Sequence, residues 1–467
     1  MQASELRKLT LLEIASLIRS EEFSPTDLAR LVLEQIRHTD NRVKAYVTVC
    51  DEKDLLIQAE ASGQRLKSHQ AAGQLDGIPI SVKDNFETEG LRTTCGSKLF
   101  RDYIPSQDCT VVKRLKQAGT IILGKLNTHE FALGGISPPT RNPWNLDHIP
   151  GGSSGGSAAA IAVGSAVVAT GSDTTGSIRL PASFCGVVGL KPTYSRVSRA
   201  GVFPNSWSLD HVGPITKHVE DAALLLEIIA GYDEDDPTSS ERPVPQYVAG
   251  LKAGITGLRV GIPKNYFFER CNEDVKKAVM KAIDLLVDLD CEVIDFEFPL
   301  IKEITTAYST ISLCETTSYH EQEIAQRPKD FQPDVKALLE RGLFIPATHY
   351  IKALRIRAMV FREVMKLFKN FDVIVTPSAP MTAPPVGQNF VTFEDRHERL
   401  DIAMFRYLGP FNLIGLPALS IPCGFSNRLP MGMQIVGRPF EEETVLRVGN
   451  AYEKSTLWHL ESPEVEE

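Results

Sequence analysis

The densest cluster of glycine and hydroxyl side chains in this sequence lies in residues 151–179, GGSSGGSAAAIAVGSAVVATGSDTTGSIR. Its four leading glycines let the backbone take positive φ or approach another group closely. Residues 158–163 predict a short buried helix, and residues 166–169 predict a buried strand that ends in the polar turn 172–177. Two serine-bearing turns therefore flank one helix and one strand. This geometry can bring Ser153 and Ser177 together and aim the N–H groups of 174–177 at one point, as an oxyanion hole requires.

Three other interpretations fit this stretch less well. A flexible linker would not enclose a helix and a strand of Ala, Ile and Val. A phosphate cradle would carry GxxxxGK[ST], which does not occur, or GxGxxG, which GGSSGG does not supply. Residues 151–155 match G-x-S-x-G, the nucleophile elbow of α/β-hydrolases, but an elbow follows a strand. Residues 141–150 instead form a polar loop bounded by proline.

The remaining segments predict an α/β chain. Thr10 and Ser24 each start an S/T-x-x-acid pattern, so two amphipathic helices open the chain. Strands are expected at 78–85, 120–124, 258–263 and 292–294, and helices at 109–119 and 274–289. The polar, weakly periodic segment 315–349 is interpreted as helices and loops that shape the mouth of a pocket.

Lys83 ends the predicted strand at 78–85, in the run Ile-Pro-Ile-Ser-Val-Lys-Asp-Asn. A lysine at a strand end is usually a solvated charge. A lysine held in a desolvated site instead loses proton affinity from a reference pKa of roughly 10.4 and can act as a base near neutral pH. Asp84 is an adjacent carboxylate, yet neighbours on a strand face opposite sides.

The motifs GGSSGGSAAA and GSDTTGSIRLPASFCGVVGLKPT, with GIPISVKDN upstream, resemble those of the amidase signature family of serine hydrolases. The resemblance continues through 124–127, 208–210 and 415–418, so it covers nearly the whole chain. It implies an α/β fold with a single large mixed β-sheet covered by helices on both faces. One domain over residues 1–467 is expected, with N-terminal helices over about 4–60, a catalytic core over about 70–235, a variable linker at 235–256 and a remainder that completes the sheet and pocket.

The resemblance also implies the roles of the site residues. Ser177 is the acyl-forming nucleophile, Ser153 the bridging serine after a cis peptide bond from Gly152, and Lys83 the base. The oxyanion would be bound by backbone N–H groups, and other residues would hold the turn in place. The N–H groups that bind the oxyanion would be those of Thr174, Thr175, Gly176 and Ser177. The residues that hold the turn in place would be Asp173, Arg179 and Ser154.

Two other nucleophile systems remain as alternatives. A Ser-His-Asp triad could draw on ten histidines, but no spacing selects one of them. Cys185 lies in the apolar run Phe-Cys-Gly-Val-Val, where a thiol behaves as a small hydrophobe.

The expected substrate is a small-molecule amide, carbamate or ureide. The alternative is the A subunit of the glutamine-dependent tRNA amidotransferase, which releases ammonia from glutamine. Arg357 sits where that relative has an arginine for the glutamine carboxylate, but Phe405 occupies the position of its aspartate, and the loop 134–142 is short. Thr175 stands where most relatives have glycine, so a positive φ there would be costly. Further substrate-binding candidates are Phe131, Tyr319 and Tyr407.

The composition limits the kinds of binding partner that are expected. A formal net charge of −9 gives no basic footprint for direct nucleic-acid binding. The eight cysteines are dispersed, with no CxxC and no cysteine-histidine cluster at zinc spacing, so neither metal nor cofactor is expected. The N-terminus is not a signal peptide and no run of 18 apolar residues occurs, so we expect a cytoplasmic chain with no membrane contact. A homodimer or a small partner subunit is left open.

Overall fold

The computed structural model describes residues 2–394 and 396–464. In these residues eleven strands form one mixed sheet. Neighbours β3, β2 and β4 are parallel, as are β9, β7 and β8, and the remaining pairs are antiparallel. Across the sheet the strands are β1 (Tyr46–Val49), β3 (Ile121–Leu126), β2 (Pro79–Lys83), β4 (Ala169–Asp173), β6 (His211–Thr216), β5 (Val188–Lys191), β12 (Ala418–Ser426), β13 (Leu429–Gly437), β9 (Val373–Pro377), β7 (Arg259–Pro263) and β8 (Glu292–Phe296). The expected α/β fold with one large mixed sheet is confirmed.

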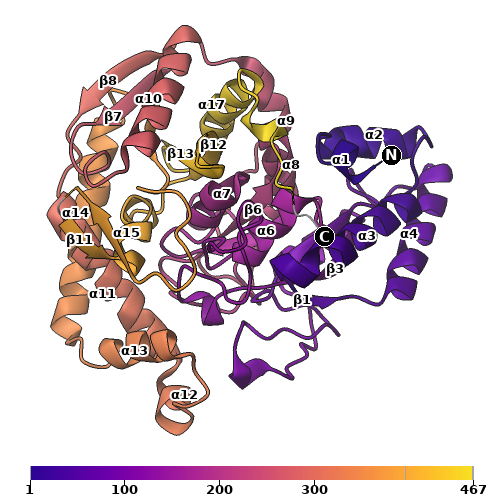
Figure 1. Ribbon diagram of the computed structural model, residues 1–467, viewed down its shortest axis with the longest axis horizontal. Coiled ribbons are helices and arrows are strands. Elements are labelled where there is room, and N and C mark those ends of the chain that lie inside the picture. Colours follow the sequence, from indigo (N-terminus) through magenta and orange to yellow (C-terminus); the bar gives the residue numbers. More distant parts are fainter. Residues whose placement is uncertain (1, 395, 465–467) are drawn as a thin grey trace.

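Helices surround this sheet, and a separate hairpin pairs β10 (Phe390–Phe393) with β11 (Arg396–Arg399). The N-terminal helices α1–α4 gather at one end of the molecule and α11–α13 at the other (Figure 1). No helix in the described part of the chain is long and apolar enough to cross a bilayer. The helices are α1 (Ala3–Leu6), α2 (Leu11–Arg19), α3 (Pro25–Val43), α4 (Glu52–Lys67), α5 (Thr110–Gln117), α6 (Gly155–Val163), α7 (Arg179–Cys185), α8 (Val219–Ile229), α9 (Tyr247–Gly250), α10 (Glu273–Asp288), α11 (Ile301–Tyr319), α12 (Glu321–Gln326), α13 (Pro333–Gly342), α14 (Ala347–Leu367), α15 (Leu400–Phe405), α16 (Gly409–Leu413) and α17 (Glu442–Lys454).

The two opening helices begin where their capping residues predict. Thr10 Oγ1 accepts a hydrogen bond from the N–H of Glu13, whose carboxylate accepts the N–H of Thr10 in return, and α2 follows. Ser24 caps α3 by accepting the Asp27 N–H at 3.0 Å, with Pro25 as the first helical residue. Both caps satisfy N–H groups that a helix leaves without an internal partner.

The strand expected at 166–169 starts later than predicted. Helix α6 ends at Gly164 in the left-handed region, and the N–H groups of Ser165 and Ala166 turn back to the carbonyl of Ala160. The chain therefore becomes extended only at Ala169, and β4 includes Ser172 and Asp173, which the sequence pattern places in the turn. This shift places both residues on the sheet, beside the end of β2.

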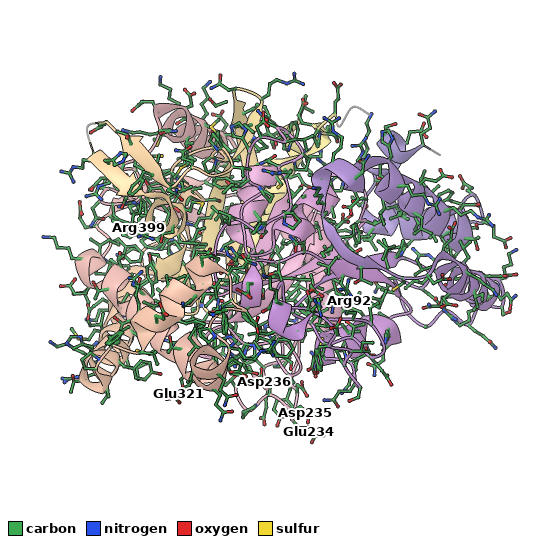
Figure 2. All side chains as sticks on the ribbon, turned by 60° about the horizontal axis from the view of Figure 1, so that its bottom comes forward. Arg92, Glu234, Asp235, Asp236, Glu321 and Arg399 are labelled. Carbon is green, nitrogen blue, oxygen red and sulfur yellow. The ribbon has the colours of Figure 1, made fainter. Side chains whose placement is uncertain are left out.

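Residues 235–256, expected as a linker, contain α9 and the short 3-10 helix Leu251–Ala253. The side chain of Tyr247 is fully buried there, with its hydroxyl 3.4 Å from the Glu442 carboxylate. The acidic run Glu234, Asp235 and Asp236 lies at the margin of the molecule (Figure 2). Asp236 still anchors to the body by accepting the N–H of Arg199 at 2.9 Å.

Helix α6 lies inside the core, because all of its residues are buried. Its sequence is apolar or small on every face, which is the pattern of a helix covered on all sides. Gly156 makes the closest approach, since its N–H donates to the Asn127 carbonyl at 3.1 Å. A Cβ at this position would lie 2.5 Å from the Asn127 nitrogen and 2.6 Å from the Ala45 carbonyl oxygen. The helix can pack this tightly only without a side chain there.

Substitution of Gly156 should therefore destabilise the protein. We expect Gly156→Ala to lower the free energy of unfolding by about 1–3 kcal/mol, because the contacts that must move are backbone atoms. The matched control is Gly63→Ala in α4, where the new Cβ would meet only Pro25 at 3.8 Å. That variant should gain about 0.5–1 kcal/mol from the lower entropy of the unfolded chain. Urea denaturation measures both, and equal effects would contradict this packing.

Candidate active site

Lys83 ends β2 with its side chain fully buried. Its Nζ donates to Ser153 Oγ at 2.8 Å and to Ser172 Oγ at 2.8 Å. Ser172 lies on the adjacent strand β4, so the parallel pairing of β2 with β4 places both groups at the same edge of the sheet. Asn85 Nδ2 also donates to Ser172 Oγ, at 3.2 Å. The predicted contact between Lys83 and Ser153 is present.

The Lys83 amine has lost proton affinity in this setting. Burial lowers the pKa of Lys83 to about 7, although the carboxylates of Asp173 and Asp210 act in the opposite direction. Asp84 lies just after the end of β2, and its carboxylate accepts the N–H of Thr94 at 3.0 Å. A substantial fraction of Lys83 is therefore uncharged near neutral pH and has a lone pair with which to accept a proton.

Ser153 is held from several directions. The Gly152–Ser153 peptide bond is cis, and the Ser153 side chain is fully buried. Its carbonyl accepts the N–H of His129 at 3.2 Å and the hydroxyl of Ser137 at 2.9 Å. A Cβ on Gly152 would lie 2.7 Å from that same Ser137 hydroxyl oxygen. The turn is thus fixed by the segment that precedes it in the chain, and its hydroxyl points to Lys83.

Ser177 lies in the second serine-bearing turn, just before α7. Its carbonyl accepts the N–H of Ser154 at 3.2 Å, which ties the two turns together through the backbone. The Ser177 hydroxyl makes no hydrogen bond within residues 2–394 and 396–464, and it faces a cavity. The link between the hydroxyls of Ser153 and Ser177 is therefore not formed as a direct bond in this structure.

The turn at 174–177 leaves its N–H groups without partners among the described residues. Gly176 has φ of 140°, and a Cβ there would lie 2.5 Å from Leu408. Thr175 is not one of the residues with positive φ, so the cost that we considered for a β-branched residue there does not arise. The glycine that this turn needs is at 176. Thr175 and Ser177 of this turn line the cavity, and unpaired donors beside a cavity are what an oxyanion hole requires.

Asp173 and Arg179 form a fully buried ion pair behind this turn. Arg179 Nε lies 3.1 Å from one carboxylate oxygen of Asp173, and a terminal guanidinium nitrogen lies 3.2 Å from the other. Burial alone would raise the pKa of Asp173, but the charge and hydrogen bonds of Arg179 keep the pKa of Asp173 below its ordinary value. Asp173 also accepts the N–H of Ile178 at 3.1 Å, so the pair braces both ends of the turn.

Further side chains in this network were missed by sequence reasoning. Gln434 accepts a hydrogen bond from Arg179 at 3.0 Å, and Asn412 Nδ2 donates to Asp173 at 2.8 Å. Ser154, predicted to support the turn, donates its hydroxyl to the Ser172 carbonyl at 3.2 Å. The only signal for Gln434 was a polar residue inside the apolar strand run Met-Gln-Ile-Val. Asn412 and Ser172 carried no such signal.

The cavity that Ser177 faces has a volume of about 940 Å³. Thr175, Ser177 and Phe405 line it, together with the loop 132–141 and one face each of α11 and α13. The lining residues of α11 are Thr305, Tyr308, Ser309, Ser312 and Leu313, and those of α13 are Asp334, Ala337, Leu338 and Arg341. Both sets recur at the three- and four-residue spacing of a helix face. Helix α13, from the segment expected to shape the mouth, thus forms part of the wall.

Comparison with known proteins assigns the family. A family model described as Amidase matches residues 27–446, which is most of the chain. The chain belongs to the amidase signature family. An amidase of Pseudomonas putida is 42% identical to this chain over 464 residues, and the alignment covers 99% of each protein. The A subunit of the glutamyl-tRNA(Gln) amidotransferase of Moorella thermoacetica is 40% identical over 494 residues, again with 99% of both covered.

Solved structures agree with this assignment. The A subunit of the glutamyl-tRNA(Gln) amidotransferase of Thermotoga maritima superimposes on this amidase signature chain with a TM-score of 0.83 at 37% identity, over 99% of each chain. A chain from a vestigial protein complex, described as revealing the evolutionary origins of an s-triazine catabolic enzyme, gives a TM-score of 0.91 at 34% identity. It covers 96% of this chain and 98% of its own. The family therefore includes relatives named as amidases and as amidotransferase subunits.

Several predicted substrate residues of this amidase signature chain lie away from the cavity wall. Phe131 is fully buried in an aromatic cluster, with its ring 5.7 Å from Phe100. Tyr407 is fully buried in the core. Arg357 lines a different cavity, of about 380 Å³, beside the ring of Tyr194. Tyr319, the last residue of α11, is 46% exposed. Of these candidates, Phe405 is the one that lines the Ser177 cavity.

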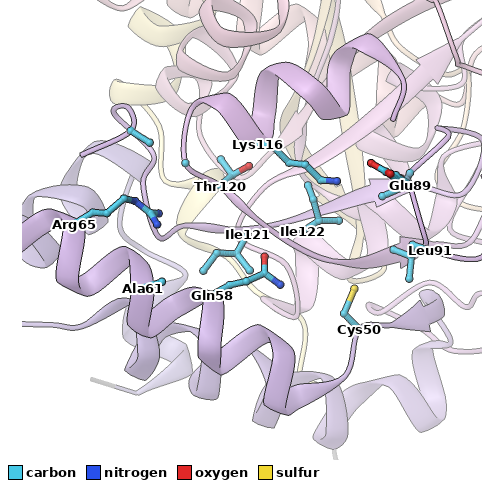
Figure 3. Close-up of a pocket in the computed structure, with 13 residues that line it drawn as sticks. Cys50, Gln58, Ala61, Arg65, Glu89, Leu91, Lys116, Thr120, Ile121 and Ile122 are labelled. Atoms are coloured by element: carbon cyan, nitrogen blue, oxygen red, sulfur yellow. The ribbon is translucent and has the colours of Figure 1, made fainter. Parts of the chain in front are cut away.

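The other cavities and side-chain clusters offer fewer groups that could take part in a reaction. A cavity of about 570 Å³ lies between α4, α5 and β3 (Figure 3). Its two cations are already paired, Arg65 with Asp76 at 2.5 Å and Lys116 with Asp108 at 2.6 Å. Cys185 is fully buried, and burial raises the pKa of its thiol. Within the described residues no cluster of His, Cys, Asp or Glu has the form of a metal site.

The buried ion pair behind the turn predicts an effect on stability. Asp173→Ala would leave the Arg179 guanidinium buried without a carboxylate, which should cost about 3–5 kcal/mol of unfolding free energy. The control is Asp330→Ala, which removes an ion pair of 2.8 Å to Arg327 whose side chains are 39% and 52% exposed. That loss should stay below about 1 kcal/mol. Urea denaturation compares them, and a loss for Asp173→Ala no greater than the control's would contradict this role.

Proposed function

We propose that this chain is an amidohydrolase that cleaves the C–N bond of a small-molecule amide, carbamate or ureide through an acyl-enzyme on Ser177. The observation that carries the proposal is the 2.8 Å hydrogen bond between the buried Lys83 amine and Ser153. A lysine with a pKa of about 7 can exchange a proton with a serine relay near neutral pH, which an ordinary lysine cannot. The family assignment supports the same reaction class.

The mechanism follows from the positions of these groups. Neutral Lys83 accepts the proton of Ser153, and Ser153 accepts the proton of Ser177 as the Ser177 oxygen attacks the carbonyl carbon. The new oxyanion is stabilised by the unpaired N–H groups of residues 174–177. The proton then returns along the same relay to the leaving nitrogen, the C–N bond breaks, and the acyl group stays on Ser177. Water is activated by the same route and releases the acid. The rate thus depends on the unprotonated fraction of Lys83, which grows as pH rises through about 7.

The relay requires the Ser177 hydroxyl to reach the hydroxyl of Ser153. Its hydroxyl has no competing hydrogen bond among the described residues, so rotation about the Cα–Cβ bond breaks nothing. The backbone bond from Ser154 N–H to the Ser177 carbonyl already holds the two turns together. Substrate in the cavity would supply the remaining constraint.

A second function is favoured by the named relatives. The amidotransferase relative from Moorella thermoacetica is 40% identical to this chain at full length, so release of ammonia from glutamine with partner subunits is the competing proposal. In the cavity, Phe405 is apolar, and the carboxylates of Asp334 and Asp401 already face His129 and Arg399. We therefore favour the stand-alone amidase. Glutamine hydrolysis that appears only with partner subunits and charged tRNA would reverse this preference.

Covalent labelling tests the proposed nucleophile. We expect a fluorophosphonate to label wild-type protein on Ser177 and to leave Ser177→Ala unlabelled. Lys83→Met should lower the labelling rate by about 10²–10⁴-fold, because proton transfer contributes that much. Lys98→Met, at the exposed start of a short 3-10 helix, is the control and should label as wild type does. Mass spectrometry locates the label. A folded wild type that stays unlabelled, or a Lys83→Met that labels at the full rate, would overturn the mechanism.

A further inference from the structure

The ionisable side chains on the wall of the Ser177 cavity do not all contact a group of opposite charge. They are His129, Arg141, Asp334, Arg341, Arg399 and Asp401. Nε2 of His129 lies 3.0 Å from Asp334, and Arg399 lies 2.7 Å from Asp401. Arg141 and Arg341 make no hydrogen bond or ion pair through their guanidinium groups in the described part of the chain. Two of the three arginines on this wall therefore have no carboxylate partner.

Arg141 is half-buried and its backbone is fixed on both sides. Its N–H donates to the Val43 carbonyl at 2.9 Å. The preceding Thr140 donates its hydroxyl to the Lys44 carbonyl at 2.7 Å, and the following Asn142 donates Nδ2 to the Phe184 carbonyl at 2.9 Å. The side chains of Thr140 and Asn142 face the interior, so Arg141 starts from an anchored position. The fixed backbone limits where the Arg141 guanidinium can reach, so less conformational freedom remains to be lost when it binds a partner.

Arg341 approaches the same cavity from another element. It lies in the last turn of α13, seven residues after Asp334 on the face that lines the cavity. Asp334 lies 3.0 Å from Nε2 of His129, and the backbone N–H of His129 donates to the Ser153 carbonyl, so α13 contacts the residue that supports the turn of the site. Arg341 is exposed, which places it at the mouth. An exposed cation there attracts anions without binding them tightly.

The remainder of the wall is largely apolar. Ile136, Leu338, Met404 and Phe405 contribute to it, from the loop 132–141, α13 and α15. The volume of about 940 Å³ lies near the upper end of the range for drug-sized ligands. Such a cavity suits a ligand with an apolar body rather than a compact polar molecule. Hydrolysis of a minimal amide would leave most of it unused.

We propose that the substrate of this site carries a carboxylate, separated from its scissile amide by an apolar segment, and that Arg141 binds this carboxylate. The inference rests on the proposed hydrolysis at Ser177 and names its substrate class. A carboxylate offers two oxygens in the geometry that a guanidinium binds through parallel N–H donors. It would satisfy the half-buried cation, and Arg341 at the mouth would favour its entry. Arg141 is thus a specificity-determining residue.

Protection of Ser177 from fluorophosphonate labelling tests this inference. The probes are monoamides of straight-chain dicarboxylic acids of increasing length, each paired with the neutral amide in which an isopropyl group replaces the carboxylate. The measured quantity is the ratio of half-protecting concentrations, neutral over carboxylated, taken from initial labelling rates. In wild type we expect this ratio to reach about 10- to 100-fold at one chain length, as a hydrogen-bonded charge pair implies.

Variants assign the preference to Arg141. Arg141→Gln should bring the ratio close to unity, and Arg141→Lys should give an intermediate ratio because the charge remains without the planar fork. Arg355→Gln, which removes an exposed arginine of α14, should keep the wild-type ratio. Because Arg141→Lys preserves the charge, it serves as the second test if Arg141→Gln folds poorly.

The outcomes separate this inference from the function on which it rests. A wild-type ratio near unity at every chain length, with Ser177 labelled normally, would overturn the carboxylate preference and leave the hydrolase intact. A ratio that persists in both Arg141 variants would overturn the assignment to Arg141. Folded wild type that is not labelled at Ser177 would overturn the proposed function and this inference together.

Discussion

Burial of the Lys83 side chain is the constraint on which the rest of the site depends. Transfer of an ammonium group into the interior is costly, and the protein avoids much of that cost by lowering the pKa of Lys83 to about 7. The neutral amine then needs hydroxyl partners rather than a carboxylate. Ser153 and Ser172 provide them at 2.8 Å each, so desolvation both creates the base and selects its neighbours.

The charges that remain buried near Lys83 are arranged so that they do not pair with it directly. Asp173 is bound by Arg179, and Asp210 accepts the hydroxyl of Thr174 at 2.6 Å and the N–H of Asn205 at 2.9 Å. Each carboxylate is thereby committed to a residue of the turn or of its support. A carboxylate in direct contact with Lys83 would hold its proton and remove the base. The same bonds fix the turn at 174–177, so the network supports the base and the oxyanion donors together.

Local motifs made much of this architecture predictable. The caps at Thr10 and Ser24 marked helix starts, because each cap is formed by residues three positions apart. The two serine turns could be brought together because only one helix and one strand lie between them, whereas Lys83 was placed with them by the resemblance to the amidase signature family. The cavity wall was not predictable. Phe131 and Tyr407 looked like ligand contacts, yet their side chains turn into the core. The lining face of α13 comes from the weakly periodic segment 315–349, and that of α11 lies just before this segment.

The central claim is that the amine of Lys83 titrates near neutral pH in the folded protein, so that a substantial fraction of it is uncharged there. NMR titration of protein with isotope-labelled lysine side chains measures this directly, with the Lys83 signal assigned by its absence in Lys83→Met. The account predicts that this signal titrates near pH 7, well below the ordinary lysine value of about 10.4. A Lys83 signal that stays in its protonated position up to pH 10 would contradict it.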